Sequence, residues 1–434
     1  MNPSESSTVV IYPARSVQGQ VRVPGDKSVS HRYAMLAGIA EGTTTLHNYS
    51  TGQDCASTLR CLRGLGCEWR HSDQGTNTIE IRGQGRRLVG PAGPLDCSNS
   101  GSTMRMLSGI LAGQEFTSEL VGDESLSRRP MARIIAPLSQ MGAKISATGD
   151  RPPLRITGGK LKAIDYATPV ASAQVKSSVL FAGLFAQGTT RVTEPVRTRD
   201  HGELGLRAFG AEVIRDGNAA SIRGGQRLHA IEASIPGDIS SAAFFLCAAA
   251  LFPGSQLIMN NVLMNPTRAR LFDFLIQLGM SISVTQIEEH HGELAGTVEV
   301  KGGRLGGATI AGADTTQLID ELPVLAAIAP YTEEGIEIRD ARELRVKESD
   351  RIATVASNLR SMGAQVEERE DGLLVPGRQS LHGAEIDSHG DHRIAMAFAV
   401  AALRAAGETK IINAAVADVS YPGFYGALEA VVQR

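Results

Sequence analysis

Six stretches of the chain share one pattern of apolar and polar positions. Each begins as a helix-like run of small and apolar residues, passes through a turn and ends in a β-rich segment. These stretches are HRYAMLAGIAEGTTTLHN (31–48), MLSGILAGQEFTSELVG (106–122), SSVLFAGLFAQGTTRVTEP (177–195), AAFFLCAAALFPGSQLIMNN (242–261), LPVLAAIAPYTEEGIEIRD (322–340) and IAMAFAVAALRAAGETKIIN (394–413). Self-similarity of this kind is typical of repeated supersecondary structure.

Five of the six stretches are followed by a second helix that ends in a glycine turn and a strand. The endings are GLGCEW, QMGAKI, AFGAEV, QLGMSI and SMGAQV. Glycine just past a helix suits a left-handed cap. Another short strand then closes near a glycine, as in IEIRG, LRITGG, ASIRGG, VEVKGG and LLVPG. Each repeat therefore predicts a β-α-β-α-β-β unit, in some cyclic order, and the chain an α/β fold.

The arrangement of the repeats predicts two lobes. The sixth repeat stops after YPGFYGALEAVVQR, and its missing strands are available as TVVIYPA (8–14) and GQVRVPG (19–25). We therefore expect the N-terminus to complete the last repeat, with 1–24 and 237–434 forming a first lobe and 25–236 a second lobe of three repeats each. Pro-Gly-Asp occurs at both expected crossings, near Pro24-Gly25 and Pro236-Gly237. The alternative is that these tripeptides are unrelated turns.

Composition excludes several classes of function. The 434 residues carry a net charge of −3 and only 4% aromatic residues, so the chain has neither a global attraction to nucleic acid or anionic membranes nor many stacking side chains. The five cysteines form no C-x-x-C pair, which argues against a zinc site or a disulfide framework. The start lacks a basic segment followed by an apolar run, and no apolar run approaches the roughly 20 residues of a membrane span. We expect a cytoplasmic protein without a signal peptide.

Polar clusters at the helix starts predict binding of anions. Ser, Asn and Asp there are ordinary N-caps. The cations near the same helix starts are not explained by capping, because the helix dipole disfavours them: Lys27, Arg32, Arg105, Lys176 and Arg393. A bound anion would resolve the conflict by accepting hydrogen bonds from free backbone N–H groups and from the basic side chains. The P-loop and G-x-G-x-x-G motifs are absent, so the expected anion site is of another type.

Two charged segments offer acid–base groups. In RELRVKESDRIA (342–353), the spacing of Lys347, Asp350 and Arg351 predicts one face of a helix, which is most simply a solvated face. Asp320-Glu321, before an apolar run, is most simply an N-cap. Paired carboxylates near clustered bases would also suit proton transfer in a dry cleft.

At these residues the chain resembles the 5-enolpyruvylshikimate 3-phosphate synthase family. The matching motifs span residues 19 to 425: VPGDKSVSHR, SNSGSTMR, LSRRPM, SAQVKSS, TEPVRTRDHGE, RVKESDR and GDHRIAMA. The resemblance implies a two-lobed enolpyruvyl transferase fold of six repeats. It also implies transfer of the enolpyruvyl group of phosphoenolpyruvate to the 5-hydroxyl of shikimate 3-phosphate in the shikimate pathway, with release of phosphate and without a metal or other cofactor.

The resemblance also implies roles for individual residues. Asp320 would accept the 5-hydroxyl proton, and Glu348, with Lys27, would protonate the methylene carbon. Contacts with shikimate 3-phosphate are expected from Lys27, Ser28, Arg32, Ser172, Gln174, Arg199, Asp320 and Lys347. Contacts with phosphoenolpyruvate are expected from Lys27, Asn99, Gly101, Arg105, Arg129, Gln174, Arg351, His392 and Arg393. The division of proton transfer among Lys27, Asp320 and Glu348 stays open.

Three positions bear on how closely the chain follows the family. Val419 stands where many relatives carry a lysine, and Ala173 where some carry a second serine, so one phosphate contact is expected to be lost or replaced at each. Gly101 stands where tolerant relatives carry alanine. The resemblance therefore implies sensitivity to glyphosate, an inhibitor that occupies the phosphoenolpyruvate site.

Two alternatives remain at the level of sequence. A UDP-N-acetylglucosamine enolpyruvyl transferase has a similar fold and the same donor, but its members usually carry a cysteine before an Arg-Pro. The corresponding segment here is GDESLSRRPM, which has no cysteine. Members occasionally carry an aspartate instead, so Asp123 keeps the alternative open. The other alternative is a non-catalytic anion-binding relative, which the presence of Lys27, Asp320, Glu348 and Arg393 disfavours. We expect small-molecule substrates, no nucleic-acid or membrane partner, and a monomer.

Overall fold

A computed structural model of the chain describes residues 7–72 and 77–434. The first six residues, part of the segment on which the expectation of no signal peptide rests, lie outside the described residues. The chain divides into two compact units. The first unit contains residues 7–24, Gly237–Glu288 and Leu294–Arg434, and the second contains Gly25–Pro236 and Glu289–Glu293. Each unit has its own hydrophobic core.

Within residues 25–72 and 77–236, the second unit contains three sheets of four strands each and a separate pair of strands. Its helices are α1 (Lys27–Gly38), α2 (Gln53–Gly64), α3 (Gly101–Ala112), α4 (Glu124–Ser127), α5 (Ala132–Met141), α6 (Ala173–Gly183) and α7 (His201–Ala208). Its sheets have the orders β16-β3-β5-β4, β6-β7-β9-β8 and β11-β13-β15-β14. The strands are β3 (Thr43–His47), β4 (Glu68–His71), β5 (Ile79–Arg82), β6 (Leu95–Asp96), β7 (Thr117–Val121), β8 (Lys144–Thr148), β9 (Arg151–Thr157), β11 (Asp165–Ala167), β13 (Thr189–Thr193), β14 (Val213–Asp216), β15 (Ala219–Arg223) and β16 (Glu232–Ser234), with β10 (Leu161–Lys162) and β12 (Ala186–Gln187) paired separately.

The first unit repeats this arrangement. Its helices are α8 (Ile239–Ala250), α9 (Arg270–Leu278), α10 (Ala313–Gln317), α11 (Leu322–Ile328), α12 (Arg351–Ser361), α13 (His392–Ala402) and α14 (Phe424–Glu429), with 3₁₀ turns η1 (Ala329–Tyr331), η2 (Arg342–Val346) and η3 (Ala414–Val419). Its sheets have the orders β18-β19-β17-β2-β26, β20-β21-β23-β22 and β1-β25-β24. The strands are β1 (Thr8–Ile11), β2 (Ser16–Val21), β17 (Gln256–Leu263), β18 (Ser281–His290), β19 (Glu293–Lys301), β20 (Gly307–Ile310), β21 (Gly335–Ile338), β22 (Glu367–Arg369), β23 (Gly372–Val375), β24 (Glu385–Asp387), β25 (Thr409–Ile412) and β26 (Val432–Gln433).

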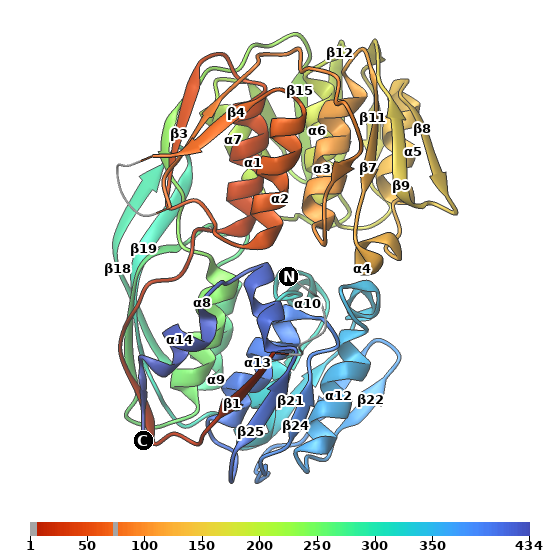
Figure 1. Cartoon of the computed structure of the whole chain (residues 1–434). Coiled ribbons are helices and arrows are strands. Elements are labelled where there is room, and N and C mark those ends of the chain that lie inside the picture. Colours follow the sequence, from red (N-terminus) through yellow and green to blue (C-terminus); the bar gives the residue numbers. More distant parts are fainter. Residues whose placement is uncertain (1–6, 73–76) are drawn as a thin grey trace. The chain divides into compact units, whose positions relative to one another are not determined.

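The first helix of each repeat lies inside its unit. Figure 1 shows α3 and α6 side by side in the second unit, and α11 and α13 pack in the same way in the first unit. Every residue of α8 and α13 is buried. The small residues of the repeat allow this packing: a methyl group on Gly109 would lie 2.0 Å from the carbonyl oxygen of Ser178, so only glycine fits between α3 and α6.

The predicted glycine turns are confirmed. The five glycines of the helix endings all have left-handed backbone: Gly66, Gly142, Gly210, Gly279 and Gly363. The polar helix starts are confirmed as caps for α1, α3, α6, α8 and α13, where a side chain accepts a hydrogen bond from a backbone N–H of the first turn.

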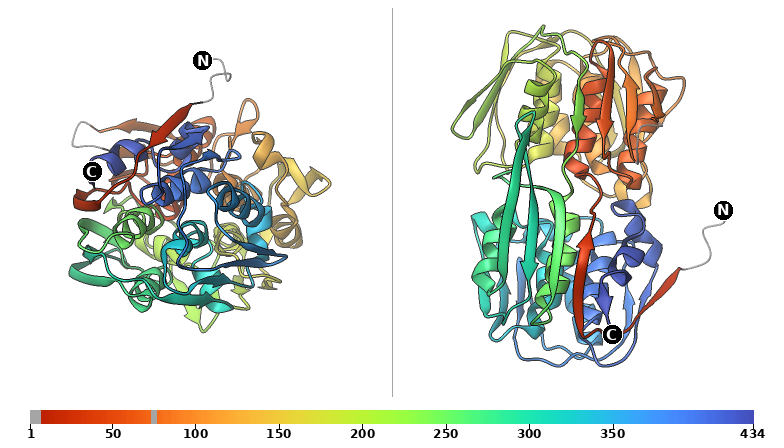
Figure 2. Two further views of the ribbon diagram at one scale, coloured as in Figure 1. Left: turned by 90° about the horizontal axis from the view of Figure 1, so that it is seen from below. Right: turned by 90° about the vertical axis from the view of Figure 1, so that its left-hand side faces the viewer.

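The N-terminal strands behave differently from each other. As predicted, β1 joins the last repeat, where it pairs with β25. The prediction for the following strand holds only in part, because β2 pairs with β26 at the end of the last repeat on one side and with β17 of the fourth repeat on the other (Figure 2). In this position β2 corresponds to β16, which closes the sheet of β3 in the second unit. Each unit is therefore closed by a strand that lies far from its sheet in the sequence.

The two Pro-Gly-Asp tripeptides lie at the boundaries of the units and form equivalent hydrogen bonds. The backbone N of Asp26 donates to the carbonyl oxygen of Pro236 at 2.7 Å, and that of Asp238 donates to Pro24 at 2.8 Å. The turn Glu289–Glu293 between β18 and β19 groups with the second unit, which the repeat pattern does not indicate. Among the described residues, none of the helices is both long enough and apolar enough to cross a membrane.

Candidate functional site

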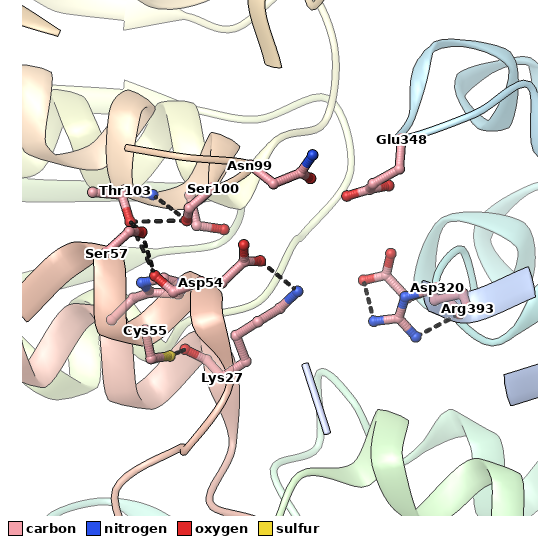
Figure 3. A network of polar contacts seen from close by, with 12 residues as sticks. Lys27, Asp54, Cys55, Ser57, Asn99, Ser100, Thr103, Asp320, Glu348 and Arg393 are labelled. Atoms are coloured by element: carbon pink, nitrogen blue, oxygen red, sulfur yellow. Dashed lines mark hydrogen bonds and ion pairs between the residues drawn. The ribbon is translucent and has the colours of Figure 1, made fainter. Parts of the chain in front are cut away.

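The residues predicted to contact substrate lie in two groups, one in each unit, and each group is called a half-site. In the second unit, Lys27 is the first residue of α1, and its Nζ lies 3.1 Å from Oδ2 of Asp54 at the start of α2 (Figure 3). The side chain of Lys27 is 17% exposed and that of Asp54 is 8% exposed, so the pair is accessible from one side only. The sequence analysis did not identify Asp54, because an aspartate in the first turn of a helix is common for reasons of the dipole alone.

The start of α3 gathers several residues expected to bind phosphoenolpyruvate. Arg129 donates from NH2 to Oδ1 of Asn99 at 2.7 Å, and Arg105 donates from NH1 to Oε1 of Gln174 at 2.8 Å. A methyl group on Gly101 would lie 2.8 Å from NH1 of Arg105 and 3.4 Å from NH1 of Arg129. The two guanidinium groups therefore lie beside the backbone of the helix start, where the helix dipole also favours an anion.

A buried polar network connects the start of α3 to α1 and α2. Ser100, the cap of α3, accepts hydrogen bonds from the backbone N of Thr103 at 3.1 Å and from its hydroxyl at 2.8 Å. The hydroxyl of Thr103 lies 2.7 Å from that of Thr58, which contacts Nδ1 of His31 at 2.7 Å. Burial, followed by the charges of Lys27 and Arg32, lowers the pKa of His31, so the ring is neutral and links α1, α2 and α3.

Arg32 connects α1 to α6. Its Nε donates to Oγ of Ser177 at 3.1 Å, and its NH1 donates to the carbonyl oxygen of Ser28 at 2.9 Å. Burial lowers the pKa of Arg32 to about 10, still far above neutrality. Ser172 caps α6, and Arg199 lies half-buried in the segment that precedes α7. Two of the cations expected to bind shikimate 3-phosphate, Arg32 and Arg199, therefore lie in the second unit.

In the first unit, the carboxylates expected to transfer protons gather around Arg351. This side chain is 1% exposed, and its NH2 donates to Oε2 of Glu348 at 2.6 Å. Its Nε donates to Oδ2 of Asp391 at 2.8 Å, and its NH1 lies 3.7 Å from Oδ1 of Asp320. Burial alone would lower the pKa of Arg351, but the surrounding carboxylates outweigh it and raise the pKa. Arg351 is therefore a permanent cation.

Arg393 fixes the backbone of Asp320. Its NH1 donates to the carbonyl oxygen of Asp320 at 2.7 Å, and its NH2 lies 3.9 Å from Oδ2 of the same residue (Figure 3). His392, the first residue of α13, is 1% exposed. Lys347 is half-buried; burial lowers its pKa, and the charge of Asp320 acts in the opposite direction.

The prediction of one helical face through Lys347, Asp350 and Arg351 is wrong. The 3₁₀ turn η2 ends at Val346, Lys347 has extended backbone, and α12 begins only at Arg351. Asp350 caps α12 by accepting from the backbone N of Ala353 at 3.1 Å. Because the chain leaves the helix between the two elements, Arg351 lies buried among Glu348, Asp320 and Asp391 rather than on a solvated face.

Comparisons with known proteins agree on one family. The family model described as EPSP synthase (3-phosphoshikimate 1-carboxyvinyltransferase) matches residues 11–428. The 3-phosphoshikimate 1-carboxyvinyltransferase of Koribacter versatilis is 61% identical over 98% of this chain and 100% of its own length. That of Solibacter usitatus is 55% identical over 98% of this chain and 99% of its own length. The solved structure of an EPSP synthase from Acinetobacter baumannii superimposes with a TM-score of 0.87 at 41% identity, covering 99% of this chain and 98% of that one.

Proposed function

The chain belongs to the EPSP synthase family, and we propose that its two half-sites divide the work of enolpyruvyl transfer between them. The reaction moves the enolpyruvyl group of phosphoenolpyruvate to the 5-hydroxyl of shikimate 3-phosphate and releases phosphate. The observation that carries the assignment of residues is the cluster in which buried Arg351 contacts Asp320, Glu348 and Asp391. This cluster holds two partly exposed carboxylates in fixed positions, as general acid–base catalysis requires.

Asp320 and Glu348 take the proton-transfer roles in this proposal. Their side chains are 16% and 15% exposed, so each has a face open to substrate while Arg351 binds the other. Glu348, assisted by Lys27, delivers a proton to the methylene carbon of phosphoenolpyruvate, and positive charge develops at the adjacent carbon. Asp320 accepts the 5-hydroxyl proton as that oxygen bonds to this carbon, which gives a tetrahedral phospho-ketal.

The second stage reverses the proton movements. The methyl group returns its proton to Glu348, the carbon–oxygen bond to phosphate breaks, and the enol ether of shikimate 3-phosphate remains. The departing phosphate gains charge, and cationic side chains arranged in advance stabilise that charge more effectively than water does. Arg129 and Arg105, together with Arg351 and Arg393, supply these cations in the proposal, with Asn99, Gly101, Gln174 and His392 completing the contacts with phosphoenolpyruvate.

Shikimate 3-phosphate takes the remaining groups. Arg32, Arg199 and Lys347 provide positive charge, and Ser28, Ser172 and Gln174 provide hydrogen bonds. Arg32 supports this role most directly, because burial lowers its pKa only to about 10 and its charge is retained at neutral pH. Ser172 already accepts a hydrogen bond from the backbone N of Val175 at 3.4 Å as the cap of α6, so its hydroxyl proton is available to a phosphate oxygen.

The direct test measures phosphate release from phosphoenolpyruvate with shikimate 3-phosphate, and separately with UDP-N-acetylglucosamine. We expect release with the first acceptor only, in accordance with the names of the relatives. Release with the second acceptor alone would favour the other enolpyruvyl transferase, and no release with either would favour a non-catalytic relative. A variant such as Lys27→Met, which removes a proposed catalytic cation, controls for a contaminating phosphatase.

We also propose that the enzyme works as a monomer in the cytoplasm. All five cysteines are free and buried, which suits a reducing compartment. Light scattering on the purified protein would test the oligomeric state.

A further inference from the structure

The charged side chain of Lys176, in α6, is buried inside the second unit. Its Nζ lies 2.7 Å from Oε2 of Glu194 and 2.9 Å from Oε1 of Glu203, and all three side chains are 1% exposed. None of the three belongs to the residues proposed to contact either substrate. Because the cost of removing such charges from water largely cancels their attraction, a buried ion pair contributes little net stability. The arrangement therefore needs an explanation other than stability.

Glu194 fixes the loop that follows β13. Its Oε2 accepts a hydrogen bond from the backbone N of Thr198 at 3.3 Å, and its Oε1 accepts one from the hydroxyl of Thr198. Residues 195–197 are exposed, whereas Thr198 is buried. The carboxylate therefore ties the end of this exposed loop to the interior, and the next residue in the chain is Arg199.

The backbone on the other side of Arg199 is tied as well. Oδ2 of Asp200 accepts hydrogen bonds from Arg197 at 2.9 Å and from Arg215 at 2.8 Å. His201, the first residue of α7, lies 2.7 Å from Oε1 of Glu293, and both side chains are buried. Arg199 is therefore a half-buried side chain between two anchored neighbours.

Arg199 lies close enough to Arg32 to act on it electrostatically. Burial lowers the pKa of Arg32 most strongly, Glu203 raises it, and the positive charge of Arg199 lowers it further. Two guanidinium groups at such range repel each other when no anion lies between them. Arg32 is held by Ser177, the residue that follows Lys176, so the same buried cluster borders both cations.

We propose that Glu194, held by Lys176, is a positioning residue that fixes the backbone beside Arg199, as Ser177 fixes Arg32, before substrate arrives. This inference rests on the proposed function, in which both arginines contact shikimate 3-phosphate. Holding the two cations in place means that less conformational freedom is lost on binding, and preorganisation of this kind increases affinity. Lys176 and Glu203 act through Glu194 and Arg32 and do not contact the substrate.

Thr198→Val tests the proposal with little risk to folding, because the side chain keeps its size and loses only the hydroxyl that binds Glu194. We expect the KM for shikimate 3-phosphate to rise about tenfold, equivalent to about 1.4 kcal/mol, while kcat and the KM for phosphoenolpyruvate stay near wild type. Thr198→Ser should restore the wild-type KM. Glu194→Gln, which weakens the tie to Lys176, should raise the same KM.

Thr190→Val is the matched control. Thr190 lies on β13 and is fully buried, and its hydroxyl has no hydrogen-bond partner among the described residues. The same chemical change should therefore leave both KM values unchanged. A rise in this control, or an equal rise in both KM values for Thr198→Val, would overturn the proposal in favour of general loosening of the unit.

Arg199→Ala distinguishes the positioning role of Glu194 from the proposed contact of Arg199 with shikimate 3-phosphate. If Arg199→Ala raises the KM for shikimate 3-phosphate while Thr198→Val and Glu194→Gln leave it unchanged, the positioning role is wrong and the proposed function stands. If Arg199→Ala also leaves it unchanged, the assignment of Arg199 to the substrate fails and the positioning role fails with it.

Discussion

The two half-sites differ in what their cations contact. In the second unit, Lys27 pairs with Asp54, but Arg32, Arg105 and Arg129 donate to uncharged acceptors: Ser177, Gln174 and Asn99. In the first unit, Arg351 and Arg393 contact carboxylates, those of Asp320, Glu348 and Asp391. A cation bonded to a neutral partner keeps its charge available to a ligand, whereas one bonded to carboxylates compensates charge inside the protein.

The difference indicates a division of labour. In the second unit, neutral acceptors orient three guanidinium groups, and guanidinium groups are well suited to bind a dianionic phosphate. The first unit holds carboxyl groups in place around Arg351, and two of these are the groups proposed to accept and deliver protons. On this view, changes in the first unit should reduce turnover, and changes in the second should reduce affinity for anions.

The largest effect should come from the carboxylates of the first unit. Asp320→Ala and Glu348→Gln should each lower kcat by roughly 10²–10⁴, because each removes a group that transfers a proton in the reaction. The KM values should stay close to those of the wild type, since Arg351 and Arg393 remain. Steady-state kinetics with both substrates would check this.

The matched control for these two variants is Glu334→Gln, an exposed carboxylate of the same unit. It should be kinetically silent. Wild-type turnover in either site variant would show that the residue does not transfer a proton. The assignment of proton transfer to the first unit would then be wrong for that residue.

A smaller effect, on binding alone, should follow from Gly101→Ala in the second unit. The added methyl group would lie 2.8 Å from NH1 of Arg105, so this flexible side chain must shift and weaken its hydrogen bond to Gln174. We expect the wild type to be sensitive to glyphosate and the inhibition constant of the variant to rise at least about tenfold, or about 1.4 kcal/mol. The KM for the shorter phosphoenolpyruvate should rise less, and kcat should be nearly unchanged.

Inhibition constants measured in competition with phosphoenolpyruvate would decide this prediction. Gly93→Ala is the control, because a methyl group there meets nothing within 4 Å. A wild type already insensitive to the inhibitor would show that differences elsewhere in the pocket outweigh the glycine. A fall in kcat as large as that expected for Asp320→Ala would contradict the division of labour.

Local features of the fold could be predicted from the sequence, whereas partners distant in the chain could not. A helix ending of this kind needs a residue with left-handed backbone, which glycine adopts without steric cost, and all five glycines adopt it. The place of β2 between β17 and β26 depends on contacts across more than 200 residues, which no local pattern encodes. The segment around Lys347 has helical spacing, but the cap formed by Asp350 starts a new helix there.

The same limit applies to the site. Motifs identified the residues proposed to contact substrate, because these residues lie in short characteristic segments. The residues that hold them in place were missed or left without a role: Asp54, Asp391, Glu194 and Glu203. Each is an ordinary acidic residue by its local sequence, and the cation that it contacts lies on another element.

The smallest expected effect sharpens the comparison, because it concerns a cation of the first unit proposed to bind substrate. Burial lowers the pKa of Lys347, and Asp320 only partly opposes this. As the pH rises through the lowered pKa, the ammonium group loses its proton and its attraction for shikimate 3-phosphate. The KM for that substrate should therefore rise a few-fold on the alkaline side, at a pH below the value of about 10.4 typical of an exposed lysine. Bound phosphate favours the charged form, so kcat should show the effect less.

Lys347→Arg isolates this titration, because a guanidinium group with a pKa above about 12 stays charged throughout the accessible range. The alkaline rise in KM should then disappear or move to higher pH, whereas Lys410→Arg, at an exposed position on β25, should leave the profile unchanged. KM profiles for both substrates across this range would check it. If the alkaline rise in KM disappears or moves to higher pH in Lys347→Arg, a cation of the first unit contributes to anion binding. Both half-sites then bind anions, and they differ only in how many carboxylates surround their cations. If the profile of Lys347→Arg matches the wild type, the group that titrates is not Lys347. Shikimate 3-phosphate would then be bound by the cations of the second unit, and the two half-sites would differ in function more than proposed.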